Sequence, residues 1–149
     1  MSTAEVARAY LVSEPTMAAR VTRAKEKIAV ARIPYRVPPA AELPGRVDAV
    51  LAVVHLLFTT GHTTPVGDEL ARRDLVERSL ELRRLLPRDP AVAGLLALLL
   101  LTDSRRETRT PPEGRLLLLE EQDRARWNRA TIAEGVSLVH EALRAWPPS

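Results

Sequence analysis

The sequence predicts an all-α fold. Leu, Ala and Arg dominate the 149 residues, and all three are strong helix formers. β-branched residues are scattered, and no segment shows the alternation of apolar and polar residues that a half-buried strand needs. Apolar residues make up 46% of the chain but only five residues are aromatic, so we expect a core built from aliphatic side chains.

Two short helices are expected at the start of the chain, over 2–12 and 15–31. Ser13 is placed to cap the second helix, and Pro15 is tolerated in its first turn because no intrahelical N–H is needed there. Four prolines follow between residues 33 and 44. Since proline cannot continue a helix, 33–44 is predicted to be a semi-extended linker and a domain boundary.

The remaining chain, 45–149, is expected to form a compact bundle of helices. Its first helix is apolar nearly all round, which is typical of a central helix, and a loop with two glycines should follow at 59–67. Pro87 should end the next helix, and Asp89 with Pro90 favours the start of another. These two helices would form a helical hairpin. The helices expected in this bundle cover 46–58, 68–86, 90–102 and 123–145.

The last third of the chain contains strong turn signals before its final helix. Residues 110–114 hold two prolines and a glycine, so a turn is expected there, and one small β-hairpin near 107–118 is an option. Apolar side chains recur at helical spacing in the final helix and should face the core. They are Ile132, Val136, Val139 and Leu143.

Composition argues against several classes of protein. The chain has no cysteine, which excludes a disulfide scaffold and a thiolate metal site and fits a reducing cytosol. Its longest apolar stretch, 91–101, is too short for a bilayer span of about 20 residues. We therefore interpret that stretch as a buried core helix and expect no membrane association.

Positive charge is concentrated at the start of the chain. Residues 1–32 hold six basic and three acidic side chains, whereas the rest holds 16 of each. The whole net charge of +3 therefore lies in this leader. A basic leader on a neutral body indicates a polyanionic partner for the leader alone.

The two leader helices have the pattern of a helix-turn-helix. Ala7 is small where two helices would cross closely. The apolar contacts that fix the crossing could come from Val6, Tyr10, Val12, Met17 and Val21. Polar and small residues share the opposite face of the second helix, where arginine could bond guanine or phosphate. That face consists of Thr16, Ala19, Arg20, Arg23 and Lys27.

Residues 3–25 resemble the helix-turn-helix of region 4 in bacterial RNA polymerase sigma factors. Further motifs are similar to the extracytoplasmic-function sigma factors that carry a helical C-terminal extension. These motifs are Ile33-Pro34-Tyr35-Arg36-Val37-Pro38, Arg46-Val47-Asp48-Ala49-Val50-Leu51-Ala52-Val53, Gly94-Leu95-Leu96-Ala97-Leu98 and Glu121-Gln122-Asp123-Arg124-Ala125-Arg126-Trp127.

The resemblance implies a cytoplasmic transcription factor and no enzyme. Its fold would be a partial helix-turn-helix at 1–32, a linker at 33–44 and a regulatory extension at 45–149. Promoter DNA and the RNA polymerase core would be its partners, and no cofactor is implied. The DNA-contacting residues would be Thr16, Ala19, Arg20 and Arg23 at the bases, with Lys27 and Arg8 at phosphates.

The chain departs from the family pattern in two respects. Many such motifs have glycine at the turn where this chain has Leu11, so a differently shaped turn is expected. The polymerase-binding domain and the first two helices of region 4 have no counterpart, which implies a piece of a longer protein. Without those helices, Val6, Tyr10 and Met17 would be partly uncovered, favouring a homodimer or a leader folded onto the body.

Other interpretations are carried alongside this one. The helical body could be a protein-interaction module with no DNA binding in this truncated form. His55, His62 and His140 show no metal-ligand spacing, so no metal site is expected. The charged segment 120–127 is interpreted as a helix start in which Glu120 pairs with Arg124 and Trp127 is a buried anchor.

Overall fold

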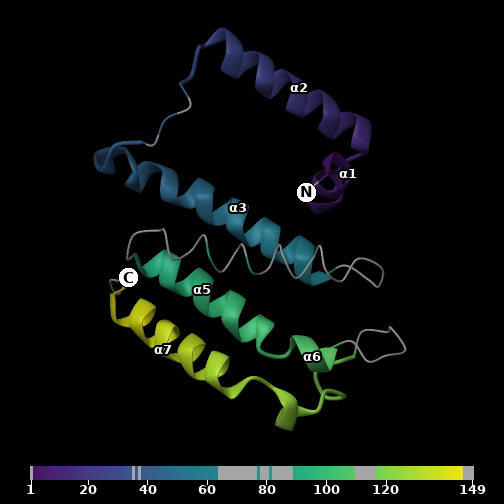
Figure 1. Cartoon of the computed structure of the whole chain (residues 1–149), viewed down its shortest axis with the longest axis vertical. Coiled ribbons are helices and arrows are strands. Elements are labelled where there is room, and N and C mark those ends of the chain that lie inside the picture. Colours follow the sequence, from purple (N-terminus) through teal and green to yellow (C-terminus); the bar gives the residue numbers. More distant parts are fainter. Residues whose placement is uncertain are drawn as a thin grey trace. The chain divides into compact units, whose positions relative to one another are not determined.

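The computed structural model describes residues 2–34, 36, 38–63, 77, 81, 89–109 and 117–145 (Figure 1). The fold is all-α, as predicted, and no strand occurs within these ranges. The chain divides into two compact units, Met1–Asp48 and Ala49–Ser149. The elements are α1 (Thr3–Ala9), α2 (Glu14–Val30), the 3₁₀ turn η1 (Ala40–Glu42), α3 (Pro44–Thr63), α5 (Pro90–Asp103), α6 (Arg106–Arg109), η2 (Arg124–Arg126) and α7 (Arg129–Ala145).

Local capping interactions set the start of each leader helix. The Ser2 N–H donates to Glu5 Oε2 at 2.5 Å and the Glu5 N–H donates to Ser2 Oγ at 3.2 Å, a reciprocal capping box. The backbone hydrogen bond from Ser2 lowers the pKa of Glu5. Ser13 caps α2 as predicted, because its Oγ accepts from the Thr16 N–H at 3.4 Å, and Pro15 lies in the first turn.

The predicted linker at 33–44 contains a 3₁₀ turn and a charged bridge. Glu42 follows two of the prolines and closes η1, with its N–H donating to the Pro39 carbonyl at 2.9 Å. Its carboxylate pairs with Arg36 at 2.9 Å and with Arg46 at 2.7 Å. This segment therefore has more local order than a semi-extended linker, although these exposed ion pairs contribute little stability.

Helix α3 extends beyond its predicted end, through the residues expected to form a loop. Gly61 lies inside the helix, and the hydroxyls of Thr59 and Thr60 donate to the carbonyls four residues earlier, at 2.8 and 2.9 Å. In the second unit, Val54 and Phe58 of α3 pack with Leu99 of α5 in a buried cluster. Val50 is 38% and Val53 is 54% exposed, so α3 is buried along one stripe and the prediction of a central helix was wrong.

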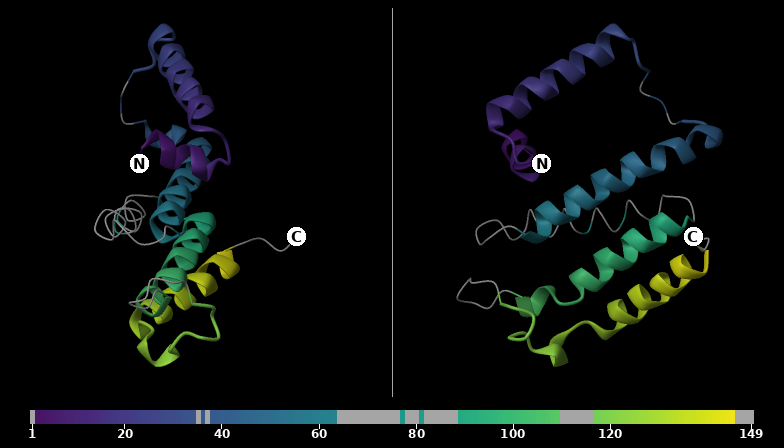
Figure 2. Two further views of the ribbon diagram at one scale, coloured as in Figure 1. Left: turned by 90° about the vertical axis from the view of Figure 1, so that its right-hand side faces the viewer. Right: turned by 180° about the vertical axis from the view of Figure 1, so that it is seen from behind.

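Helices α5 and α7 run antiparallel and side by side, and they form the main core of the second unit (Figure 2). Asp89 caps α5 as predicted, since its Oδ1 accepts from the Ala91 N–H at 2.8 Å. The buried side chains shared by the two helices are Ala93, Leu96, Ala97, Leu100 and Leu138.

The predicted core face of α7 was only partly right, because Val139 packs against the core cluster but the fully buried residues lie one position earlier than predicted ones. Gly135 and Leu138 are buried, whereas Val136 is 42% and Leu143 is 69% exposed. A β-carbon on Gly135 would lie 2.8 Å from Leu101 Cγ, so the absence of a side chain is what lets α7 approach α5 on this face. Apolar residues do recur at helical spacing in α7, but the close contact with α5 at Gly135 buries the neighbouring row of residues.

The segment before α7 also differs from the prediction. Residues 124–126 form a separate 3₁₀ turn capped by Asp123, and α7 begins only after Asn128, whose Oδ1 accepts from the Thr131 N–H at 3.1 Å. Glu120 lies in a turn and makes no ion pair with Arg124 among the described residues. Trp127 is partly buried, with the Arg124 guanidinium 5.7 Å from its ring centre.

The optional β-hairpin is not supported where the structure describes the chain. Residues 106–109 form α6, and Leu117 donates one backbone bond to the Arg109 carbonyl at 2.9 Å. The expected turn at 110–114 lies outside the described residues. So does most of the helix predicted at 68–86, of which Glu77 and Glu81 are described and helical. Within the described ranges, every helix is too short or too polar to span a lipid bilayer.

Candidate nucleic-acid interface

The junction between α1 and α2 is a tight turn built around Leu11. Leu11 has a φ of 52°, in the left-handed region, and is 93% exposed. The Val12 N–H donates to the Ala7 carbonyl at 3.0 Å and the Leu11 N–H donates to the Arg8 carbonyl at 3.1 Å. These two bonds form a Schellman motif, which usually has glycine at this position. The expectation of a reshaped turn was therefore wrong, because leucine adopts the conformation that glycine would.

The two helices meet at small or buried side chains near this turn. Helices α1 and α2 contact each other, and Ala7 is 2% exposed. Met17 is 6% exposed, so the expectation that it would be uncovered was wrong. Val6 is half-buried and Tyr10 is 56% exposed, so these two side chains are partly uncovered, as expected. The turn interrupts the helical conformation between α1 and α2, as a helix-turn-helix requires.

Four side chains form one stripe along α2. Thr16, Arg20, Arg23 and Lys27 are separated by four, three and four residues, so they lie on one side of a helix with 100° per residue. All four are exposed. Ala19 is exposed at the edge of this stripe, and Arg8 is exposed in the last turn of α1. The structure therefore places five of the six predicted DNA-contacting residues on α2 and the sixth on α1.

The positive charge of this stripe is not neutralised within the described part of the chain. Helix α2 has two acidic residues, Glu14 in its first turn and Glu26. Neither makes an ion pair with Arg20, Arg23 or Lys27 among the described residues. An exposed row of unpaired cations can attract a phosphate backbone, and guanidinium groups can also bond guanine.

Thr16 has a second role at the start of the stripe. Its side-chain oxygen lies 2.8 Å from Ser13 Oγ, in the cap of α2.

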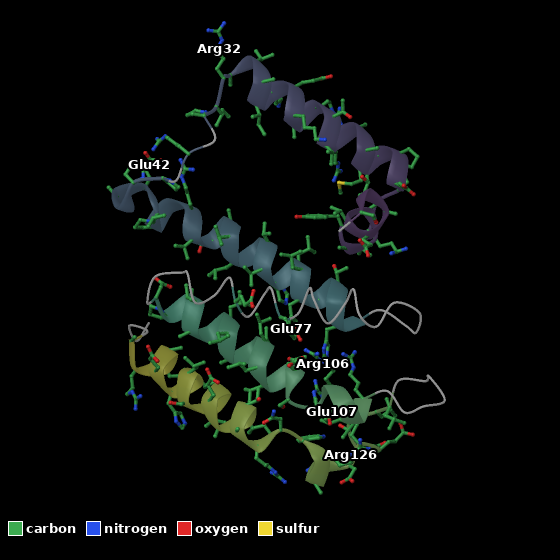
Figure 3. All side chains as sticks on the ribbon, in the orientation of Figure 1. Arg32, Glu42, Glu77, Arg106, Glu107 and Arg126 are labelled. Atoms are coloured by element: carbon green, nitrogen blue, oxygen red, sulfur yellow. The ribbon has the colours of Figure 1, made fainter. Side chains whose placement is uncertain are left out.

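Helix α2 ends in the same way as α1, with Arg32 at a φ of 47° and the Ile33 N–H donating to the Ile28 carbonyl at 3.2 Å. Figure 3 shows the Arg32 side chain beyond this end of the helix.

Sequence reasoning missed a second cationic cluster, in the other unit. Arg109 of α6 donates to the His62 carbonyl at 3.0 Å, and Arg105 and Arg106 precede it in the same turn. The spacing of three arginines within five residues was a visible signal. Nothing in the sequence indicated that these arginines lie near the end of α3, because the hydrogen bond from Arg109 to His62 joins residues 47 positions apart.

The histidines do not converge on one site. His55 and His140 are exposed, while His62 is half-buried near the end of α3. Across the described ranges, no three His, Asp or Glu side chains come together in a way that could hold a metal ion.

The chain has relatives, and none of those found has a described function. A family model described as "Family of unknown function (DUF6596)" matches residues 46–143. An uncharacterized protein of Rhizobium meliloti (strain 1021) is 40% identical over 148 residues, which cover 97% of this chain. The match covers 35% of that curated relative, so the chain spans well under half of its length. No solved structure matches the chain.

Proposed function

The chain belongs to the family of unknown function DUF6596, and we propose that it serves bacterial transcription initiation as a piece of a sigma factor. In this proposal α2 reads promoter DNA, and the helical body regulates that contact. The observation that carries the proposal is the exposed basic stripe of α2, which forms no ion pair among the described residues, beside a tight interhelical turn. A recognition helix needs both features, since the turn orients the helix and the stripe contacts DNA.

Each residue of the interface has a role that follows from its chemistry. Arg20 and Arg23 would bond base edges, because a planar guanidinium can donate two parallel hydrogen bonds to guanine. Thr16 and Ala19 would pack against the same bases. Lys27 and Arg8 would contact phosphates and fix the register of the helix without reading sequence.

The wider context supports a protein longer than this chain. The curated relative extends far beyond the matched segment. The part that binds the RNA polymerase core would lie outside residues 1–149, and the longer protein would act in the cytoplasm without an enzymatic step. Residues 45–149 would be its regulatory extension, and most of them fall within the family match.

The proposal is tested by removing charge from the stripe in the longer protein. The Arg20→Ala/Arg23→Ala double variant should bind duplexes selected from a random pool at least tenfold more weakly than the wild type. The slope of log K against log salt should also become shallower, by about 0.9 for each phosphate that the variant no longer neutralises. Fluorescence anisotropy at several salt concentrations measures both quantities.

Lys25→Ala is the matched control for this experiment. Lys25 is exposed on α2 but lies roughly opposite the stripe, by the 100° rotation per residue. Its removal should leave the affinity nearly unchanged. Equal losses in all variants would indicate nonspecific charge attraction. An unchanged affinity in the double variant would favour the alternative, an interaction module that does not bind DNA.

A further inference from the structure

Three arginines gather where α3 ends and α6 begins. Arg109 Nη1 donates to the carbonyl oxygen of His62 at 3.0 Å. Arg106 pairs with Asp103 at 2.5 Å, and its Nε also donates to that carboxylate at 2.7 Å. Arg105, the residue just before α6, is half-buried beside them. Asp103 thus balances the charge of Arg106, and neither Arg105 nor Arg109 forms an ion pair among the described residues.

The side chain of His62 lies among these cations. Its ring stacks on Phe58, with ring centres 5.2 Å apart and planes inclined by 15°. Its Nε2 atom is buried and has no hydrogen-bond partner among the described residues. Burial lowers the pKa of His62 to about 4, with further contributions from Arg109, Arg105 and Arg106. Among the described residues, the charges that act on this imidazole are those of three arginines.

Structural roles account for only part of the cluster. An arginine that bonds a carbonyl in the last turn of a helix stabilises the negative end of that helix, which explains Arg109. The ion pair between Arg106 and Asp103 accounts for the position of Arg106. Arg105 and the Nε2 atom of His62 are not explained in either way. Burial and the nearby Arg105 also lower the pKa of Arg109, so these two cations disfavour each other's charge.

We propose that Arg105, Arg109 and His62 form a binding site for the phosphate group of a small molecule. Guanidinium groups bind phosphate oxygens through two parallel N–H donors, and two such groups match a dianion in charge. A bound phosphate would relieve the repulsion between the arginines and accept a hydrogen bond from Nε2. This site lies on the helical body, away from the α2 stripe in sequence, and goes beyond the proposed DNA contact.

Calorimetric titration of the whole chain with inorganic phosphate at pH 7 and constant ionic strength tests the site. We expect saturable binding, weakened about tenfold or more in Arg105→Ala, since that variant removes a charge-assisted hydrogen bond. Arg126→Ala is the matched control, because Arg126 is exposed on η2 and should leave the affinity unchanged. A parallel titration with glycerol phosphate distinguishes free phosphate from a phosphomonoester as the preferred ligand.

A second readout keeps the test independent of folding defects. The imidazole of His62, followed by NMR in sulfate, should titrate at a higher pH than in chloride, because a neighbouring dianion favours the protonated ring. His55 and His140 serve as internal references. The absence of saturable binding of both phosphate compounds would overturn the proposal. So would equal affinities in Arg105→Ala and the wild type, or a His62 titration that is the same in sulfate and chloride.

Discussion

Leu11 holds a backbone conformation that costs a leucine free energy. Its φ of 52° lies in the left-handed region, which is unfavourable by about 1–2 kcal/mol for a residue with a β-carbon. The side chain is 93% exposed, so it recovers almost nothing by burial. The two bonds of the Schellman motif, from Leu11 and Val12, hold the turn in place despite this cost.

Leu11→Gly should therefore stabilise the leader, by about 0.5–1 kcal/mol after the larger entropy of an unfolded glycine is included. Urea unfolding followed by circular dichroism measures the change. Leu11→Ala keeps the β-carbon and should leave the stability close to that of the wild type. A less stable glycine variant would mean that the leucine side chain makes contacts that matter.

The titration of His62 predicts a pH dependence of stability. Its pKa is lowered to about 4 in the folded chain, chiefly by burial, against an ordinary value of 6.5. Because the unfolded chain then binds the proton more readily, the free energy of unfolding should fall as the pH decreases from 6.5 towards 4. The contribution of neutral His62 to the free energy of unfolding is fully present above pH 6.5.

The difference between the wild type and His62→Phe isolates this effect from the carboxylates. Phenylalanine can still stack on Phe58 but does not titrate, so the variant should lose less stability between pH 6.5 and 4. Urea unfolding at several pH values measures the difference. His140→Gln changes an exposed histidine and should retain the wild-type slope; parallel curves for His62→Phe and the wild type would exclude the buried titration.

At the scale of elements, two glycines inside helices have opposite roles. A β-carbon on Gly94 of α5 would meet nothing within 4 Å. One on Gly135 of α7 would lie 2.8 Å from Leu101 Cγ and 3.0 Å from Leu101 Cδ2. Since glycine disfavours a helix to a similar extent at both sites, packing alone separates them.

Gly94→Ala should raise the free energy of unfolding by about 0.5–1 kcal/mol, from helix propensity. Gly135→Ala should lower it by about 1–3 kcal/mol, because Leu101 and α5 must move. Chemical denaturation of both variants gives the comparison, with each serving as the control for the other. Stabilisation by alanine at both positions would show that α5 and α7 are not in close contact at Gly135.

At the scale of the whole molecule, exposed apolar side chains accompany the basic leader. Tyr10 is 56%, Ile28 is 50% and Val30 is 85% exposed. Apolar surface of this kind favours association, so we expect the chain to form a homodimer through its leader. Sedimentation equilibrium should show a mass that rises with concentration, and Ile28→Ser/Val30→Ser should weaken the association.

Leu118→Ser provides the matched control for self-association. Leu118 is 64% exposed but belongs to the second unit. If the leader mediates dimerisation, this variant should associate like the wild type. A monomeric wild-type chain at all concentrations would contradict the prediction.

The helices of this protein were predictable where their ends depend on neighbouring residues. Ser13 and Asp89 cap α2 and α5 as expected, because a cap joins groups only two or three positions apart. The six interface residues remain a prediction, but the exposure and common stripe of most of them followed from helical spacing. The left-handed Leu11 was not expected, since leucine is an unfavourable residue there.

The sequence by itself determined an all-α chain, a basic leader and the caps that begin its helices, because composition and local bonds decide these properties. The tertiary structure decided which face of α7 is buried and that three arginines surround the end of α3. Helical periodicity leaves two neighbouring stripes available, and contact with α5 at Gly135 selects between them. Arg109 reaches His62 from 47 residues away, and no local pattern encodes such an encounter.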